Sequence, residues 1–129
     1  MPRPSVATSK KDFTTDMKEF ATDMKEGVTV ALPRKLDGLE ADHELGSLPQ
    51  WTRDGEVIER VTVFPTFTDA IRAVDEIALI AEELNHHPDI DIRWRTVRLA
   101  MTTHDVDGLS TLDIEAARRI DASIDAIVG

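Results

Sequence analysis

The chain has 129 residues, a formal net charge of −10 at pH 7 and no cysteine. This length favours one domain with a single core, and the acidic balance argues against a broad surface for nucleic acid or anionic lipid. The lack of cysteine excludes disulfides, thiolate metal ligands and a thiol nucleophile. With no apolar run near the roughly 18 residues of a membrane span and no signal-like start, we expect a cytoplasmic protein that binds neither nucleic acid nor membrane.

Residues 1–33 are predicted to be an N-terminal extension, and residues 34–129 a domain. Within the extension a heptad repeats, so that four apolar residues recur on one helical face: Phe13, Met17, Phe20 and Met24. The pattern predicts a short amphipathic helix that ends near Gly27. Two heptads are too few for a coiled coil. The helix either packs on its own domain or a neighbouring subunit, or docks on another protein. Residues 28–32 are strand-like in composition but end at Pro33.

The first half of the domain contains a hairpin signal followed by a helical pattern. Asp54-Gly55 stands between the strand-like stretches 51–53 and 56–64, which predicts two antiparallel strands. Thr66 and Asp69 resemble a capping arrangement that opens a helix through Leu84. The expected inner face of this helix consists of Phe67, Ala70, Ile71, Val74, Ile77, Ala78, Ala81 and Leu84. Because Pro88 disfavours a helical conformation at His87, the helix should end close to the pair His86-His87.

The second half has a strand-like stretch whose apolar phase changes. Apolar residues occupy positions 90, 92 and 94, then 97, 99 and 101, so a turn or bulge near Arg95-Thr96 is needed to keep one buried face. Ser110 with Asp113 is predicted to cap a final helix. Its core stripe is expected to be Ile114, Ala117, Ile120, Ile124 and Ile127.

Three of the four histidines, His86, His87 and His104, fall within nineteen residues, and His104 ends the strand-like run. Imidazole can donate and accept a proton near neutral pH, so the cluster suggests acid–base chemistry. Two alternatives are a pair of histidines favoured by the negative end of a helix dipole and a three-imidazole zinc site. The spacing matches none of the familiar zinc motifs. His43 lies elsewhere and is expected to be solvated.

From about residue 48 to residue 129 the sequence resembles the pterin-4a-carbinolamine dehydratases, also called 4a-hydroxytetrahydrobiopterin dehydratases. The hallmark of this family is an acid–Leu–Asp–His–His–Pro stretch, a strand region, Thr-His-Asp, a Gly-Gly-Leu turn and a final helix. The matching residues are Glu82, Leu84, Asn85, His86, His87, Pro88, Thr103, His104, Asp105, Gly108 and Leu109. Two positions depart from the pattern: Asn85 replaces the usual Asp, and Asp107 replaces the first Gly. Asn85 can still accept a hydrogen bond but cannot lend negative charge.

The resemblance implies an α+β fold with a four-stranded antiparallel sheet and helices on one face, in the order α-β-β-α-β-β-α. Family members carry a short helix before the Trp, and Leu36, Leu39, Leu45 and Leu48 are expected to form its apolar side. The implied activity is dehydration of a 4a-hydroxytetrahydropterin to the quinonoid dihydropterin. His86 and His104 would be the acid–base pair, and His87 would chiefly hold the pterin. The further residues expected to bind substrate are Glu82, Asn85, Pro88, Thr103 and Asp105.

The pterin would be the substrate, and neither a cofactor nor a metal is expected. A homodimer or homotetramer is expected, as is functional pairing with an aromatic amino acid hydroxylase. Two other functions remain open: a non-catalytic binding or assembly module of the same fold, and a dehydratase-like enzyme recruited to another biosynthetic pathway.

Overall fold

The computed structural model describes residues 33–129, and Pro33–Gly129 forms one compact unit. The predicted helix with the Phe13/Met17/Phe20/Met24 stripe and the strand-like stretch 28–32 lie outside the described residues. The division of the chain at residue 33 remains a prediction. Within residues 33–129, no helix combines the length and the apolar character needed to cross a membrane.

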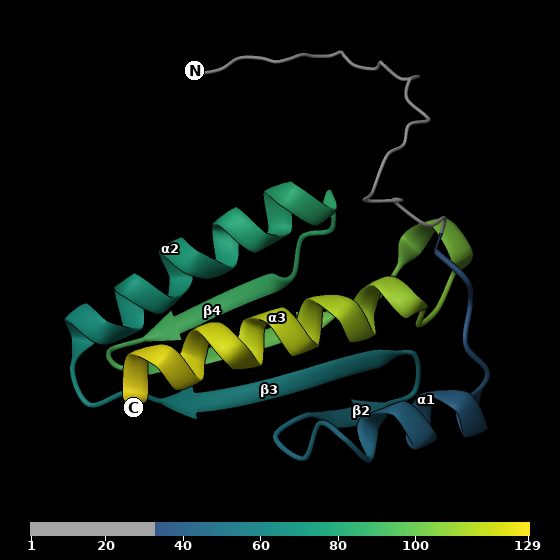
Figure 1. The fold of residues 1–129 in the computed structure, drawn as a ribbon, viewed down its shortest axis with the longest axis horizontal. Helices are drawn as coiled ribbons and strands as arrows, with labels where there is room; N and C mark the ends of the chain where they lie inside the picture. The colour runs from purple at the N-terminus through teal and green to yellow at the C-terminus, as the bar shows by residue number, and fades with distance from the viewer. Residues whose placement is uncertain (1–32) are drawn as a thin grey trace, which may run out of the picture. The chain divides into compact units, whose positions relative to one another are not determined.

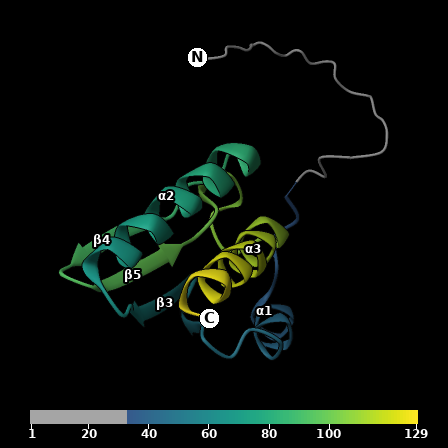
Figure 2. The same cartoon turned by 60° about the vertical axis from the view of Figure 1, so that its left-hand side comes forward.

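The core of the unit is a four-stranded antiparallel sheet in the order β2-β3-β5-β4. The strands are β2 (Thr52–Asp54), β3 (Val57–Val63), β4 (Asp89–Arg93) and β5 (Thr96–Met101). Two long helices, α2 (Phe67–Leu84) and α3 (Thr111–Val128), cover one face of the sheet, and the short helix α1 (Gly38–Leu45) lies beside β2 (Figures 1 and 2). This arrangement confirms the α+β fold and the α-β-β-α-β-β-α order.

Both predicted turns are present. Asp54 pairs with Val57, so the β2–β3 turn is Gly55-Glu56, one residue later than expected, with Gly55 in the left-handed region at φ 62°. Arg93 pairs with Thr96 across a turn at Trp94-Arg95. Ile92 therefore lies opposite Val97, which restores a common buried face across the change of apolar phase. The backbone of Trp94 lies in the left-handed region and its side chain is 72% exposed, so the residue belongs to the turn.

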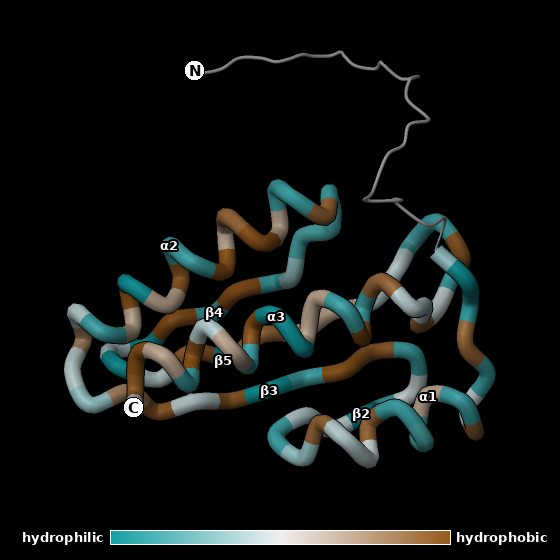
Figure 3. Tube along the Cα trace, in the orientation of Figure 1, coloured by the Kyte–Doolittle hydropathy of each residue, from teal (hydrophilic) through white to brown (hydrophobic). Residues whose placement is uncertain are grey.

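The inner face of α2 is narrower than expected. Ala70, Ile77 and Ala81 are buried as predicted, and Ala73 joins them. Phe67, Ile71 and Ala78 were wrongly placed on the inner face, because they are exposed on a neighbouring stripe of the helix. The expected face was broader than the strip of helix surface that meets the sheet and α3, so apolar spacing alone overestimated burial. Figure 3 shows apolar and polar segments alternating along α2 and α3.

Helix α1 begins with a capping box between Asp37 and Glu40. Leu36 and Leu48 flank the helix and are buried, but Leu39 is 84% exposed and Ala41 is the residue of α1 that faces the core. Leu39 was therefore wrongly assigned, since only one side of a two-turn helix meets the domain.

An ion pair connects the sheet to α3. The buried Arg60 of β3 pairs with Asp121 of α3, which also accepts a 2.8 Å hydrogen bond from Trp51 Nε1.

Candidate active site

The histidine pair follows a left-handed helix cap. Helix α2 ends at Leu84, and its C-cap Asn85 has φ 49° and ψ 46°. The His86 N–H then donates to the Ala81 carbonyl at 3.0 Å, which closes the helix end. Asn is, after Gly, the residue that best tolerates this conformation. The departure at Asn85 is therefore compatible with the backbone, and within residues 33–129 its side chain makes no hydrogen bond to an imidazole.

His86 points into the protein and meets a buried carboxylate. Its Nε2 lies 2.6 Å from Oδ1 of Asp113, and the exposed fractions of the two side chains are 9% and 0%. Asp113 is the third residue of α3, and it completes a capping box with Ser110. The end of α2 and the start of α3 thus meet at one end of the domain (Figure 1).

The other carboxylate oxygen of Asp113 is also occupied. Oδ2 accepts hydrogen bonds from the Thr103 hydroxyl at 2.6 Å and from the Ser110 N–H at 2.9 Å. The Thr103 and Ser110 hydroxyl oxygens are 2.7 Å apart, and Ser110 Oγ also accepts from the Leu112 N–H. Because the Thr103 hydroxyl donates its proton to Asp113, the Ser110 hydroxyl is the donor in the hydrogen bond between Ser110 and Thr103. Asp113 acts only as an acceptor in this arrangement, so His86 Nε2 is the protonated nitrogen and Nδ1 is the one left for other partners.

His87 lies in a different environment from its neighbour. Its Nε2 is 2.6 Å from Oε2 of Glu82, and 56% of the His87 side chain and 76% of the Glu82 side chain are exposed. Pro88 follows, half-buried, before β4 begins at Asp89. The pair therefore presents an imidazole and a carboxylate to solvent.

His104 begins the short 3₁₀ helix η1 (His104–Val106), directly after β5 and Thr103. The side chains of His104 and Asp105 are exposed, and within residues 33–129 the His104 imidazole has no hydrogen-bond partner. Asp107 caps η1 with φ 56°. A glycine would adopt this conformation without strain, and Asp is among the few other residues that tolerate it. The second departure from the family pattern is thus also compatible with the backbone.

The contacts connect the histidine-bearing segments in one chain of residues. His86 contacts Asp113, Asp113 contacts Thr103, and Thr103 precedes His104. His43 is exposed on α1, apart from this chain of contacts. The part of the chain that the structure describes holds no group of three or more His, Asp or Glu side chains arranged to bind a metal ion.

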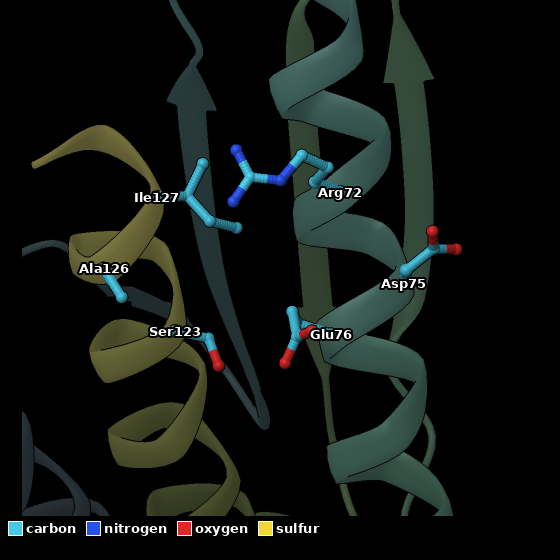
Figure 4. A pocket seen from close by; sticks show the side chains of 6 residues that line it. All are labelled: Arg72, Asp75, Glu76, Ser123, Ala126 and Ile127. Atoms are coloured by element: carbon cyan, nitrogen blue, oxygen red, sulfur yellow. The ribbon is translucent and has the colours of Figure 1, made fainter.

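A groove of about 250 Å³ lies between α2 and α3, but it is remote from the histidines. Arg72, Asp75 and Glu76 line it from α2, and Ser123, Ala126 and Ile127 line it from α3 (Figure 4). These residues belong to the first ten residues of α2 and the last turns of α3, whereas the histidine network uses the opposite helix ends. The groove is therefore separate from the candidate active site.

Asp113 is the residue of the site that the sequence did not reveal. Its position three residues after Ser110 predicted a helix cap, and the structure has that cap. The same carboxylate also binds His86, which lies 27 residues earlier in the chain. The signal in the sequence is the use of Asp, since the capping box ordinarily ends in Glu or Gln.

Comparisons with known proteins identify the family of the chain. Residues 34–123 match the family model described as pterin 4 alpha carbinolamine dehydratase. The chain belongs to this family. A protein of Roseiflexus sp. (strain RS-1), provisionally named a pterin-4-alpha-carbinolamine dehydratase, is 46% identical over 87 residues, covering 67% of this chain and 94% of the relative. A Mycobacterium tuberculosis (strain H37Rv) protein with the same provisional name is 51% identical over 87 residues, covering 67% of this chain and 93% of its own.

A solved structure has the same fold. The crystal structure of a transcriptional coactivator/pterin dehydratase from Brucella melitensis is 32% identical, with a TM-score of 0.67. The match covers 74% of this chain and 100% of the Brucella chain. The shared fold therefore extends over the whole of that dehydratase-family structure.

Proposed function

We propose that this protein dehydrates a 4a-hydroxytetrahydropterin to the quinonoid dihydropterin by histidine acid–base catalysis. The observation that carries the proposal is the His86–Asp113–Thr103 network. In this network the buried Asp113 carboxylate binds both the His86 imidazole and Thr103, the residue directly before His104. Membership of the dehydratase family, with relatives provisionally named as dehydratases, supports the substrate class.

The reaction needs one acid and one base. The acid protonates the departing 4a-hydroxyl as its carbon–oxygen bond breaks, and the base removes a proton from a ring nitrogen, so that water leaves and a C=N bond forms. Electrons stay within the pterin, so no redox cofactor is required. The pterin is the substrate, and no metal is assigned a role.

His86 and His104 are proposed as the acid–base pair. Because Asp113 binds His86 Nε2, the ring is held in one orientation and its Nδ1 is the nitrogen assigned to the substrate proton. His104 has no partner within residues 33–129 and is exposed, so its ring is free to meet a pterin. His87 and Glu82 are proposed to hold the pterin, together with Asn85, Pro88, Thr103 and Asp105 as the family resemblance implies. The Thr103 hydroxyl already has two protein partners, so its proposed contribution is through the network.

The experiment is an assay of purified protein with chemically generated 4a-hydroxytetrahydropterin. His104→Ala should lower kcat by about 10²–10⁴-fold, the typical worth of acid–base catalysis. The exposed His43 offers a matched control, and His43→Ala should turn over like the parent. Equal activity of the His104 and parent proteins would contradict the assignment. Loss of parent activity on chelator treatment would contradict the metal-free mechanism.

The same assay separates the alternatives. A protein that binds a pterin without turnover would be a binding or assembly module, and one that does neither would have been recruited to another substrate. The relative from Brucella, named both a transcriptional coactivator and a pterin dehydratase, gives the first alternative its support. Association into dimers or tetramers and pairing with an aromatic amino acid hydroxylase remain part of the proposal. The exposed Phe67 and Ile71 on α2 provide apolar surface for self-association.

A further inference from the structure

The loop that carries His104 is closed on itself by backbone hydrogen bonds. The Thr103 N–H donates to the Gly108 carbonyl at 2.9 Å, and the Gly108 N–H donates back to the Thr103 carbonyl at 3.2 Å. Inside the loop, the Asp107 N–H donates to the His104 carbonyl at 3.0 Å. These bonds fix the shape of the loop. Its position relative to the rest of the domain depends on contacts made from outside.

One such contact comes from Glu56, in the distant turn between β2 and β3. Its Oε1 accepts a 3.2 Å hydrogen bond from the N–H of Leu109. Leu109 is 1% exposed, and a buried N–H without an acceptor is costly. Within residues 33–129, Glu56 provides the acceptor for this N–H. The carboxylate therefore ties the His104 loop to the hairpin.

Gly108 makes this approach possible. A Cβ added at Gly108 would lie 2.6 Å from Oε1 of Glu56 and 3.0 Å from Cε of Lys35. Gly108 does not have a positive φ, so its backbone conformation does not require glycine. An alanine here would instead displace the end of the Glu56 side chain. Lys35 completes the arrangement by donating from Nζ to the Asp107 carbonyl at 3.2 Å.

We propose that Glu56 is a positioning residue for His104, acting through the Leu109 N–H across the space that Gly108 leaves free. The proposal rests on the proposed dehydratase function. Without the carboxylate, Leu109 loses its acceptor and the loop moves, which displaces His104 from the reacting hydroxyl. A misplacement of about 1 Å costs on the order of 10²-fold in rate. The effect falls on kcat, because the His87–Glu82 pair proposed to hold the pterin does not contact Glu56.

The test compares Glu56→Ala, Glu56→Gln, Gly108→Ala and the double variant Glu56→Ala/Gly108→Ala in the full chain. Asp42→Ala is the matched control, because Asp42 binds Arg53 on the same hairpin through an exposed ion pair and does not contact the loop. The readouts are kcat, KM, thermal unfolding and hydrogen exchange of the Leu109 amide, which Glu56 protects in this structure.

Glu56→Ala should lower kcat by roughly 10- to 100-fold with little change in KM, and should speed exchange at Leu109. Glu56→Gln should restore both, since the Gln carbonyl oxygen accepts the same hydrogen bond. Gly108→Ala should lower kcat as much as Glu56→Ala does. In the double variant kcat should fall little further, because both substitutions break the same contact. The proposal is overturned if Glu56→Ala matches Asp42→Ala in kcat, if Gln does not rescue, or if the two losses multiply.

Hydrogen exchange separates this proposal from the proposed function. If the parent shows no dehydratase activity, the proposed function fails, and the proposal that rests on it fails as a statement about catalysis. Accelerated exchange at Leu109 in Glu56→Ala would then still establish the contact. If the parent is active but exchange at Leu109 is unchanged in Glu56→Ala, the positioning role fails and the dehydratase function stands.

Discussion

Two adjacent histidines form carboxylate pairs of the same length in opposite surroundings. His86 and Asp113 are 2.6 Å apart and almost completely buried, whereas His87 and Glu82 are also 2.6 Å apart and largely exposed. The left-handed cap at Asn85 turns the chain, so that consecutive side chains face the interior and the solvent. Distance alone therefore says little about what each pair does.

Burial decides the difference. An exposed ion pair is screened by water and contributes about 0–1 kcal/mol to stability. A buried charged group depends on its hydrogen-bond partners, and removing one partner costs about 3–5 kcal/mol. We therefore interpret His86–Asp113 as a fixed part of the structure that orients the imidazole proposed for catalysis, and His87–Glu82 as an adjustable pair that is available to a ligand.

The largest expected effect is that of Asp113→Ala. It leaves His86 Nε2, the Thr103 hydroxyl and the Ser110 N–H without their shared acceptor. The free energy of unfolding should fall by about 3–5 kcal/mol, measured by urea denaturation. Asp113→Asn should retain the shape but cannot accept all three bonds, and should lose about 1–3 kcal/mol. A loss below 1 kcal/mol for Asp113→Ala would break the contrast between the two pairs.

His87→Ala should act on substrate binding, because its exposed ring is assigned to holding the pterin. The Kd for a pterin should rise by roughly 3- to 10-fold, the value of about one hydrogen bond, measured by calorimetry with a stable product analogue. His104→Ala is the comparison variant and should weaken binding less. The reverse order would exchange the roles of the two residues and leave the dehydratase proposal standing.

Glu82→Ala tests the exposed pair directly. The free energy of unfolding should change by less than about 1 kcal/mol, because both partners remain solvated when they are separated. Urea denaturation of this variant beside Asp113→Ala gives the comparison under one set of conditions. A loss of several kcal/mol would show that the exposed pair is a structural element as well.

The smallest effect is expected at Asp42, an exposed carboxyl elsewhere. Hydrogen bonds from Arg53 hold the pKa of Asp42 below its ordinary value of 3.8. Because the folded-state pKa is lowered, the stabilisation is present above the ordinary pKa and is lost as the pH falls through the folded-state value. Stability measured against pH should show a slightly weaker acid decline in Asp42→Ala than in the parent. Identical curves down to pH 2 would assign no stabilisation to this pair.

The sequence predicted most of the fold because local chemistry agreed with the tertiary arrangement. Thr66 and Ser110 cap helices as expected, and Ile92 and Val97 meet across the turn that the change of apolar phase required. Errors arose where an apolar pattern was broader than the available contact. Phe67, Ile71 and Leu39 fit helical stripes but are exposed, since periodicity indicates the side of a helix that is apolar and not how much of it another element covers.

The sequence by itself determined the elements, the histidine motif and the family, because these depend on residue types at short, fixed spacings. Only the tertiary structure decided what each histidine contacts. Asp113 reaches His86 because the start of α3 packs against the end of α2, and Glu56 reaches Leu109 because the β2–β3 hairpin lies beside the His104 loop. Such contacts join residues 27 and 53 positions apart, so they depend on how the helices and strands pack rather than on local spacing.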